Sequence, residues 1–309
     1  HGEFVFDHAW ANAYAQYGLA YYPKWLIGVP YSPVTGPRLL SRDVAHKRLL
    51  LEAMRGAAPR LGLHSLHANF LESEDLDAFD GDWLARQDVQ FHWTRDPGWS
   101  TFDDFTAALD SKRRKNLRAD RRRVLDAGVV LRVLDGAAAR GEAMAAMHRF
   151  YAQTFAEKWN HAAMTEGFFQ HLCDAFPGAV VLILAEREGE AIAGALCLRS
   201  DDTLYGRYWG AMVDVPGLHF EACYHQGIAH CIDRGLDRFE PGAQGEHKLA
   251  RGFLPTLTHS RHWLAEPRFH EALKRWCAEE RRATTRYRDG LGAHSPFRDG
   301  GGRPSGRPS

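Results

Sequence analysis

The order of strand and helix patterns along the chain restricts its fold most. After Gly128 the patterns read strand, helix, helix, hairpin, strand, helix, strand, helix, strand. The hairpin is the clearest part, because residues 179–186 and 191–198 are apolar runs of strand length joined by the turn Glu188-Gly189-Glu190. Strands that alternate with helices in this way predict an α/β (α+β) fold, with mixed sheets flanked by helices.

The residues before position 100 repeat the later part of this order as strand, helix, strand, short helix, strand. We therefore predict two copies of one α/β unit, over residues 1–100 and 128–288, joined by a helix over residues 101–127. The chain starts at His1, just before residues that read as a strand, so the first unit is expected to lack its opening elements. Residues 289–309 are rich in Gly, Arg, Pro and Ser and predict a disordered tail.

Composition narrows the possible functions. The 39 basic and 39 acidic side chains cancel, which argues against a dedicated nucleic-acid-binding protein. No apolar stretch approaches the ~20 residues of a membrane-spanning helix, so no membrane insertion is expected. The five cysteines are scattered and form no CxxC pair, which predicts neither a disulfide framework nor a zinc ribbon. A reducing cytoplasm is therefore the expected location.

A basic segment stands out at residues 111–123. Arg114, Arg118 and Arg121 fall on one face if this segment is helical, and several guanidinium groups suit the oxygens of a phosphate-rich ligand. The alternative is a solvated helix face between two domains, and the charge pattern alone favours that alternative. RNA binding through the same segment is a further alternative, which predicts steep salt dependence.

The loop after Glu240 is the richest candidate site. It leaves a predicted strand, passes two glycines and enters a short predicted helix, so its backbone N–H groups could approach an anionic ligand. Glu240 itself would stand at the carboxyl end of a strand, where α/β sheets place ligand sites. An ordinary turn between strand and helix is the alternative. The candidate binding residues of this loop are Gly242, Gln244, Gly245, Glu246 and Lys248.

Polar residues also gather near the start of the preceding helix. His219 and Glu221 are predicted to line a site, or else to be helix caps and surface groups. A metal site is not expected, because the HExxH spacing is missing. Tyr208 is either a core residue or a general acid at the mouth of a cleft. No GxSxG motif is present, so the sequence does not support a covalent mechanism.

Three segments together resemble a known family. Residues 109–122 are similar to the linker helix of Fem-like, tandem-GNAT proteins, and residues 31–37 to the proline- and glycine-containing edge of their first half. Residues 235–253 resemble their late strand, loop and helix, with an acid closing the strand and a lysine before a Gly-Phe pair. The resemblance runs from residue 1 to about residue 290. It is strongest with the bacterial subgroup of peptidoglycan biosynthesis/recognition proteins, or GNAT family N-acetyltransferases.

The resemblance implies a double GNAT-like fold and the transfer of an acyl or aminoacyl group to an amine. It implies acyl-CoA or aminoacyl-tRNA as a donor substrate, no tightly bound cofactor, and a small-molecule or peptide amine as the acceptor, with a peptidoglycan precursor as one such acceptor. The GNAT pyrophosphate loop, Q/RxxGxG/A, is absent at residues 213–219. This absence favours the alternative of a non-catalytic module that recognises a cell-wall peptide or a nucleotide-linked sugar.

We assign expected roles on this basis. Glu240, with Glu221 or His219, is expected to line the acceptor amine, and Tyr208 to act as a general acid. Lys248 and Arg251 are expected to hold a phosphate or carboxylate, and the face that carries Arg114 and Arg118 to contact a phosphate-bearing donor.

Overall fold

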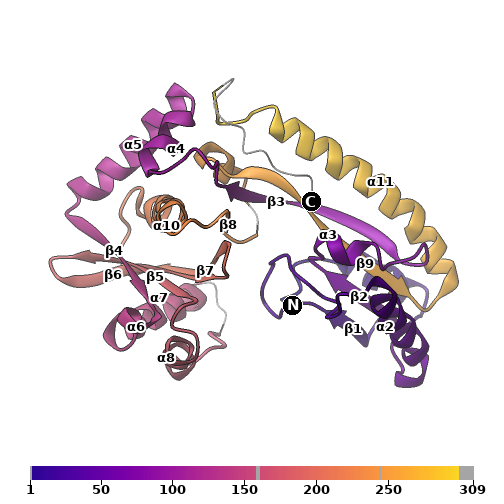
Figure 1. The fold of residues 1–309 in the computed structure, drawn as a ribbon. Helices are drawn as coiled ribbons and strands as arrows, with labels where there is room; N and C mark the ends of the chain where they lie inside the picture. The colour runs from indigo at the N-terminus through magenta and orange to yellow at the C-terminus, as the bar shows by residue number, and fades with distance from the viewer. Residues whose placement is uncertain (1, 158–160, 244, 299–309) are drawn as a thin grey trace. The chain divides into compact units, whose positions relative to one another are not determined.

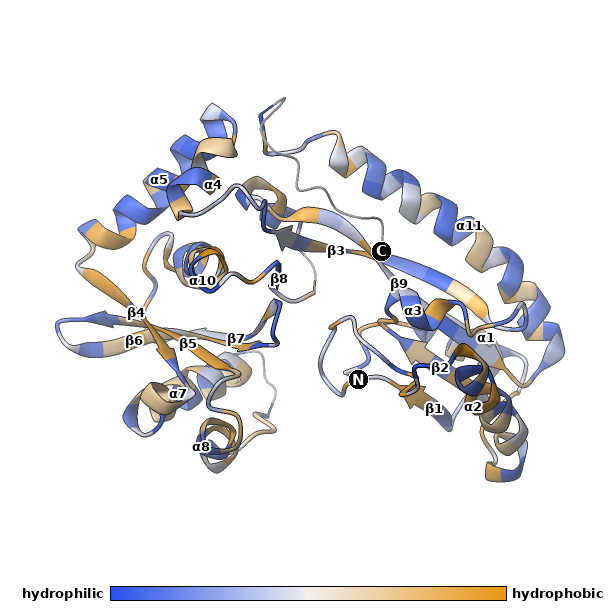
Figure 2. Ribbon diagram, viewed as in Figure 1, coloured by the Kyte–Doolittle hydropathy of each residue, from blue (hydrophilic) through white to orange (hydrophobic). Residues whose placement is uncertain are grey.

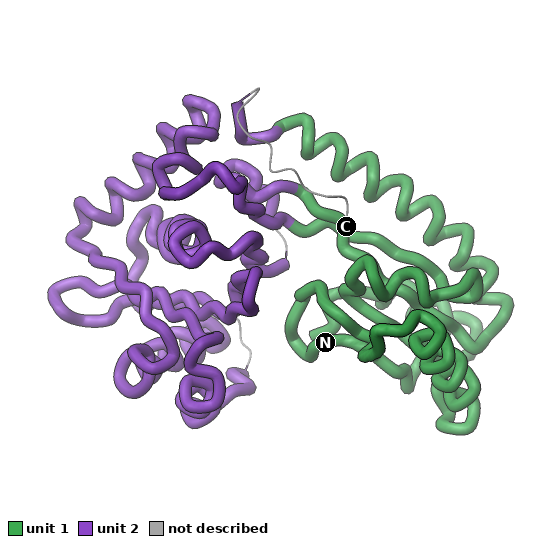
Figure 3. The backbone as a smooth tube through the Cα atoms, in the orientation of Figure 1, with its two compact units in different colours: residues 1–90, 255–294, 307–309 green, residues 91–254, 295–306 purple. Residues whose placement is uncertain are grey.

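The computed structural model describes residues 2–157, 161–243 and 245–298. The chain divides into two compact units (Figure 3). Of the described residues, unit 1 contains those up to Gln90 and Pro255–His294, and unit 2 contains those in Phe91–Leu254 together with residues 295–298. This division differs from the predicted one, because the last strand and the last long helix belong with the first part of the chain. Pairing between strands far apart in sequence decides this, and local patterns do not report it.

Unit 1 is built on strands in the order β1-β2-β9-β3. Strand β1 pairs parallel to β2, and β2 pairs antiparallel to β9. A parallel pair needs a crossover connection, which helix α2 supplies between β1 and β2. The strands are β1 (Lys24–Ile27), β2 (Ser65–Asn69), β3 (Leu84–Thr94) and β9 (Leu254–Leu264). The helices are α1 (His8–Gln16), α2 (Val44–Ala57), η1 (Pro59–Leu61), α3 (Ser73–Leu76) and α11 (Pro267–Gly292).

The core of unit 1 is aromatic. Trp10, Tyr14 and Tyr21 are almost fully buried, together with Cys277 of α11. Large aromatic side chains remove much apolar area from water, which stabilises the packing of α1 and α11 in this unit. Figure 1 labels α11, and Figure 2 labels both helices and colours them by hydropathy.

Unit 2 carries strands in the order β3-β8-β7-β6-β5-β4. Strands β4 to β7 are antiparallel neighbours, β7 pairs parallel to β8, and β8 pairs antiparallel to the end of β3. The predicted hairpin is confirmed as β5 and β6, with Glu188 and Gly189 at positive φ in its turn. The strands of this unit are β4 (Val129–Asp135), β5 (Val180–Arg187), β6 (Glu190–Arg199), β7 (Thr203–Ala211) and β8 (Arg238–Glu240).

Helices cover both faces of the strands of unit 2. Helices α7 and α8 lie on one side of β5 to β7, and α10 lies on the other (Figure 1). Helix α7 approaches β7 so closely that a Cβ on Gly210 would overlap the carbonyl oxygen of Phe150. The helices are α4 (Phe102–Ala108), α5 (Ser111–Asp126), α6 (Gly136–Ala139), α7 (Glu142–Glu157), α8 (Glu166–Ala175), α9 (Leu218–Phe220), the π-helical turn η2 (Glu221–His225), α10 (Gln226–Arg234) and the 3₁₀ turn η3 (Glu246–Arg251).

The predicted linker helix over residues 101–127 is two helices. Thr101 and Asp104 form a capping box that starts α4, and Leu109 is extended and ends it. Asp110 then accepts a hydrogen bond from the Arg113 N–H and caps α5. Asp and Ser compete for backbone hydrogen bonds and favour helix starts, so the Asp110-Ser111 pair restarts the helix.

The predictions for the two ends of the chain also need correction. Residues 4–6 form no strand, and Phe4 takes a left-handed φ of 57°. Helix α11 continues to Gly292, and Phe297 is buried against Trp99, so the part of the predicted tail that is described is ordered. Residues 299–309 of that tail lie outside the described residues.

The mixed α/β fold is confirmed, with strands of both orientations flanked by helices. The two-copy relationship stays a prediction. Among the described residues, none of the helices combines the length and apolarity that crossing a bilayer requires.

Candidate functional site

The candidate site of unit 2 lies where two parallel strands stop pairing. Strand β7 pairs with β8 only from Thr203 to Tyr205, although β7 continues along β6 as far as Ala211. Strand β8 ends at Glu240, the partner of Tyr205. The chain then turns away at Pro241, which lies close to Gly206. A Cβ added to Gly206 would be 3.1 Å from the Cα of Pro241. The sequence prediction that Glu240 closes a strand is therefore correct.

Glu240 is buried, with 3% of its surface exposed. Its Oε1 lies 3.6 Å from an Arg238 guanidinium nitrogen and 3.9 Å from His92 Nδ1. Burial, together with the charges of Arg238 and Lys248, lowers the pKa of His92 to about 3, so this imidazole is neutral. The carboxylate thus faces one cation and one neutral ring inside the protein.

The loop after Glu240 is held by Lys248, which is also buried. Its ammonium donates to the carbonyl oxygens of Gly242 at 2.8 Å and Ala243 at 3.4 Å. Burial lowers the pKa of Lys248 to about 8. Gly245 has a φ of 115°, and a Cβ there would collide with the His247 ring, so this position requires glycine. Lys248 therefore fixes the loop through two of its three N–H groups.

The remaining predicted residues of the loop have different surroundings. Gln244 lies outside the described residues, and Glu246 is exposed at the start of η3. Arg251 stacks on the Phe220 ring, and its guanidinium lies 3.3 Å from Asp120 Oδ2. Arg251 thus has partners within unit 2, as Lys248 does.

Glu221 begins the π-helical turn η2, a local structure that often marks functional sites. Its carboxylate contacts His225 Nδ1 at 2.9 Å and accepts from Gln226 at 2.7 Å. Arg121 Nε lies 3.3 Å away. Burial acts to raise the pKa of Glu221, but the hydrogen bond and charge of His225 and the charge of Arg121 keep it below its usual value. Glu221 is therefore an ionised, well-partnered carboxylate.

The predicted catalytic residues fall on two faces of the strands. Tyr208 packs on Tyr151 in the cluster under α7 and α8, while the next residue, Trp209, packs on His219. Phe239 meets Gly227 of α10, so Glu240, one position on, points to the opposite face. Glu240 is thus separated by the strands from α10.

Burial keeps both Tyr208 and His219 in their uncharged forms. The Tyr208 hydroxyl donates to Met164 Sδ at 3.7 Å, and burial raises the pKa of Tyr208. Burial lowers the pKa of His219 to about 4, and His247 and Arg251 add to the effect. Near neutral pH, His219 is therefore an uncharged imidazole and Tyr208 an un-ionised phenol.

The basic face of α5 is only partly available to a ligand. Arg114 donates to the carbonyl oxygens of Ala107 and Leu109 at the end of α4. Arg121 stacks on Phe102 and contacts Glu221. Arg118 is exposed and makes no hydrogen bond or ion pair with the residues that the structure describes. Of the three arginines predicted on this face, Arg118 alone stands ready for a phosphate.

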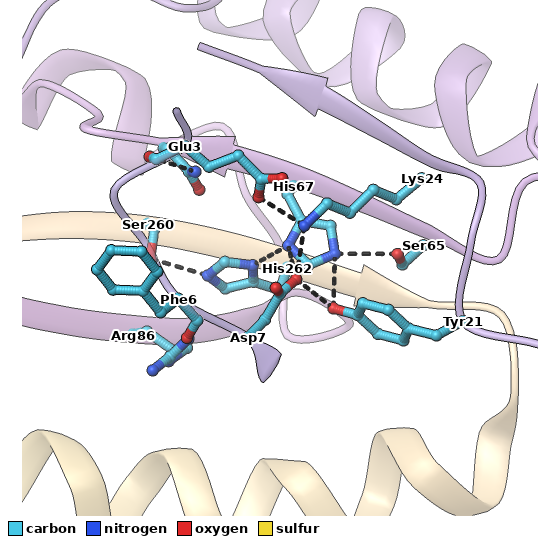
Figure 4. Close-up of polar contacts among 11 residues, drawn as sticks. Glu3, Phe6, Asp7, Tyr21, Lys24, Ser65, His67, Arg86, Ser260 and His262 are labelled. Carbon is cyan, nitrogen blue, oxygen red and sulfur yellow. Dashed lines mark hydrogen bonds and ion pairs between the residues drawn. The ribbon is translucent and has the colours of Figure 1, made fainter. Parts of the chain in front are cut away.

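A second polar cluster, in unit 1, was missed by sequence reasoning (Figure 4). His67 and His262 are fully buried and paired across β2 and β9, with 2.7 Å between their Nδ1 atoms. Ser260 contacts His262 Nε2 at 2.8 Å, and Ser65 contacts His67 Nε2 at 2.9 Å. The sequence signal is a Ser-x-His pattern that occurs in both strands, at 65–67 and 260–262.

This chain of side chains ends on a buried ion pair. The Tyr21 hydroxyl lies 3.3 Å from His67 Nε2 and donates to Asp7 Oδ2 at 2.5 Å. The ammonium of Lys24 contacts the same Asp7 oxygen at 2.7 Å and Glu3 at 2.5 Å. Burying these charges is costly without partners, and here each has one at hydrogen-bond distance. Within the ranges described, no group of three His, Cys, Asp or Glu side chains is arranged to hold a metal ion.

Comparisons with solved structures support the fold. The C-terminal domain of a putative lysylphosphatidylglycerol synthetase from Agrobacterium fabrum is similar, with a TM-score of 0.54 at 11% identity, covering 75% of this chain and 77% of that chain. L-PGS from Bacillus licheniformis has a TM-score of 0.50 at 12% identity, with 74% and 77% covered. FemX has a TM-score of 0.48 at 10% identity, with 80% and 85% covered.

Similarity of sequence is seen at the level of the family. No curated protein matches the chain. The FemAB-like family, described as peptidoglycan biosynthesis/recognition, matches residues 1–299. The resemblance to Fem-like proteins inferred from residues 109–122 and 235–253 is therefore confirmed: this chain belongs to the FemAB-like family.

Proposed function

We propose that this protein transfers an acyl or aminoacyl group to an amine, with a peptide amine of a peptidoglycan precursor as the acceptor class. One observation carries the proposal: Glu240 is a buried carboxylate at the carboxyl end of β8, where β7 and β8 stop pairing. Ligand sites of α/β sheets lie at such strand ends. Membership of a peptidoglycan biosynthesis/recognition family supports the acceptor class.

Glu240 would act as the general base. The amine lone pair forms the new C–N bond, the bond from the acyl carbon to the donor's sulfur or oxygen breaks, and its electron pair leaves on that atom. Glu240 accepts the proton that the amine nitrogen loses, and the leaving group takes up a proton. Positioned proton transfer of this kind contributes about 10²- to 10⁴-fold to a rate.

The cations near the loop would bind the donor. Lys248 keeps a third N–H beyond the two bonds to carbonyl oxygens, and Arg251 lies on the same turn. Together with the exposed Arg118, they suit a phosphate or carboxylate of the donor. Acyl-CoA and aminoacyl-tRNA both carry such phosphates and remain the two donor classes.

We also propose that the two units are related GNAT-like copies. In each unit a parallel strand pair is joined by a helical crossover and flanked by an antiparallel strand, as β1-β2-β9 and as β7-β8-β3. This shared strand arrangement supports a duplication of one ancestral unit, in addition to the similar order of elements along the chain.

A recognition module without catalysis is the second candidate. The observation that favours it is that Glu221, Lys248 and Arg251 all have partners within the protein. Such partners would hold a peptide-binding surface rigid without any chemistry.

Ligand binding and turnover by the whole chain separate the two candidates. We expect acyl-CoA or charged tRNA to raise the melting temperature, and a muropeptide to cause release of the acyl group from that donor. Stabilisation by the muropeptide alone, with no donor bound and no release, would contradict the transferase and support the recognition module.

A further inference from the structure

The contact between Tyr21 and His67 sets one hydrogen-bond direction along the buried chain of unit 1 when His67 carries its proton on Nε2. Tyr21 gives its proton to Asp7, so its oxygen can only accept at the side that faces His67 Nε2 (Figure 4). Burial and the charge of Lys24 lower the pKa of His67 to about 3, and burial lowers the pKa of His262 well below its usual value. Each ring is therefore neutral and carries one N–H.

This direction passes along the chain to Ser260. If His67 carries its proton on Nε2, its Nδ1 accepts from the N–H at His262 Nδ1, 2.7 Å away. His262 Nε2 then has only a lone pair, so the Ser260 hydroxyl must donate to it at 2.8 Å. The hydroxyl proton of Ser260 is thus used in the bond to His262. The lone pairs of the Ser260 oxygen can still accept a hydrogen bond from another donor.

Ser260 lines a cavity of about 130 Å³ in unit 1. The one cation of its wall, Arg86, is fully used: Nε and one terminal nitrogen contact Glu280 at 2.8 and 2.7 Å, and the other donates to the carbonyl oxygen of Phe6 at 3.0 Å. An anion entering this cavity would therefore compete with a bidentate ion pair for its partner.

The wall offers several acceptor oxygens. Asp88 is an exposed carboxylate at this wall, and its Oδ1 accepts from the Val89 N–H. Its Oδ2 takes no hydrogen bond from residues 2–157, 161–243 or 245–298. The amide nitrogen of Gln87 lies 3.4 Å from His259 Nδ1, and its carbonyl oxygen accepts no hydrogen bond from the described residues. Phe70, also on the wall, holds a left-handed φ of 56°, a strain typical of binding sites.

From this juxtaposition we propose that the cavity binds the ammonium group of a small primary amine with a short apolar chain. An ammonium offers three N–H donors, which match the oxygens of Ser260 and Gln87 and the carboxylate of Asp88. Phe6 and Phe70 supply apolar wall for the chain. The proposal does not depend on the transfer reaction proposed for unit 2.

The cavity recognises the amine and does not remove its proton. Asp7 at the far end of the chain has a pKa lowered by Lys24 and Tyr21, although burial alone would raise it. Alkylammonium groups such as that of lysine ordinarily titrate near pH ~10. Proton transfer from such an ammonium to Asp7 or to either histidine is therefore strongly uphill, and the bound species is the cation.

The test is an NMR titration of the full chain with n-butylammonium chloride and, at matched ionic strength, with sodium butyrate. We expect butylammonium, and not butyrate, to shift the backbone amide signals of Gln87, Thr258 and Ser260. Ser260→Ala should weaken its binding about tenfold, since a hydrogen bond to a charged group is lost. Asp88→Asn should weaken it about two- to fivefold, because this carboxylate is exposed.

Ser65→Ala is the matched control at the other end of the chain. It keeps Tyr21 as the acceptor for His67, so amine binding should change less than twofold. If Ser260→Ala fails to fold, the exposed Asp88→Asn variant carries the test. Binding of butyrate as tight as that of butylammonium, no shift with either ligand, or equal losses in Ser65→Ala and Ser260→Ala would each overturn the proposal.

Discussion

The two units bury their polar side chains in different ways. In unit 1, Asp7, Tyr21 and Lys24 meet at 2.5 to 2.7 Å, and the chain continues through two histidines. In unit 2, the ion-pair contacts of Glu240 are 3.6 and 3.9 Å long. Short hydrogen bonds fix the protonation and direction of a group, whereas contacts near 4 Å act mainly through charge. The first arrangement suits recognition and stability, and in the second a buried carboxylate lies near the charge of Arg238.

The largest expected effect comes from breaking the ion pair of unit 1. Lys24→Met leaves Asp7 buried and without its cation, which should cost about 3–5 kcal/mol of unfolding free energy. Urea denaturation measures this loss. Lys115→Met, at an exposed lysine of α5, is the control and should change stability by less than about 0.5 kcal/mol. A Lys24→Met loss below about 1 kcal/mol would contradict the role given to the pair.

The buried histidines predict how stability depends on pH. The pKa values of His67 and His262 are lowered on folding, so the unfolded chain binds more protons once the pH falls below about 6.5. Their contribution is present above that pH and is lost as the pH falls toward the folded values. Each histidine contributes a slope of about 1.4 kcal/mol per pH unit in this window.

His262→Gln should therefore flatten the curve of unfolding free energy against pH between 6 and 4. Denaturant titrations at a series of pH values measure the slope. An unchanged slope would mean that His262 is not held neutral by its burial.

Glu221 offers a contrast with Glu240 within unit 2. Glu221→Gln weakens the hydrogen bonds to His225 and Gln226 and the ion pair with Arg121. This should lower the free energy of unfolding by about 1–3 kcal/mol. We expect acyl transfer to survive, because this carboxylate is committed to the π-helical turn. Thermal melts and turnover assays, with Glu190→Gln at an exposed position of β6 as the control, check both parts. Loss of turnover with unchanged stability would move the catalytic role to Glu221.

The smallest effects distinguish two arginines of α5. Arg114→Ala removes a hydrogen-bond donor to the last carbonyl oxygens of α4 and should lower the free energy of unfolding by about 0.5–1 kcal/mol. Arg118→Ala should leave the melting temperature unchanged and weaken binding of a phosphate-bearing donor. Equal donor affinity in wild type and Arg118→Ala would remove this residue from the donor site.

Local patterns were enough to predict much of unit 2. The β5–β6 hairpin follows from two apolar runs and the Glu188-Gly189 turn, and the end of β8 at Glu240 follows from the Pro-Gly pair after it. These features depend on residues a few positions apart, which sequence reasoning can weigh. The break between α4 and α5 at Asp110 was missed although a capping residue marks it, because the charged residues on both sides fit one continuous helix.

The polar chain of unit 1 could not be predicted in the same way. Asp7, Tyr21, His67 and His262 come from four separate segments, and strand pairing alone brings them together. The repeated Ser-x-His pattern was visible, but its meaning depends on the antiparallel register of β2 and β9. The same long-range pairing placed β9 and α11 in unit 1, against the predicted domain boundaries.

The central claim is that the carboxylate of Glu240 takes the proton of the attacking amine. The most direct measurement is amine-dependent acyl release by Glu240→Gln compared with wild type, using Glu190→Gln, at an exposed glutamate of β6, as the matched change. We predict that Glu240→Gln slows release by about 10²-fold or more while donor binding and the melting temperature are kept, and that Glu190→Gln is close to wild type. Release by Glu240→Gln at the wild-type rate would contradict the account.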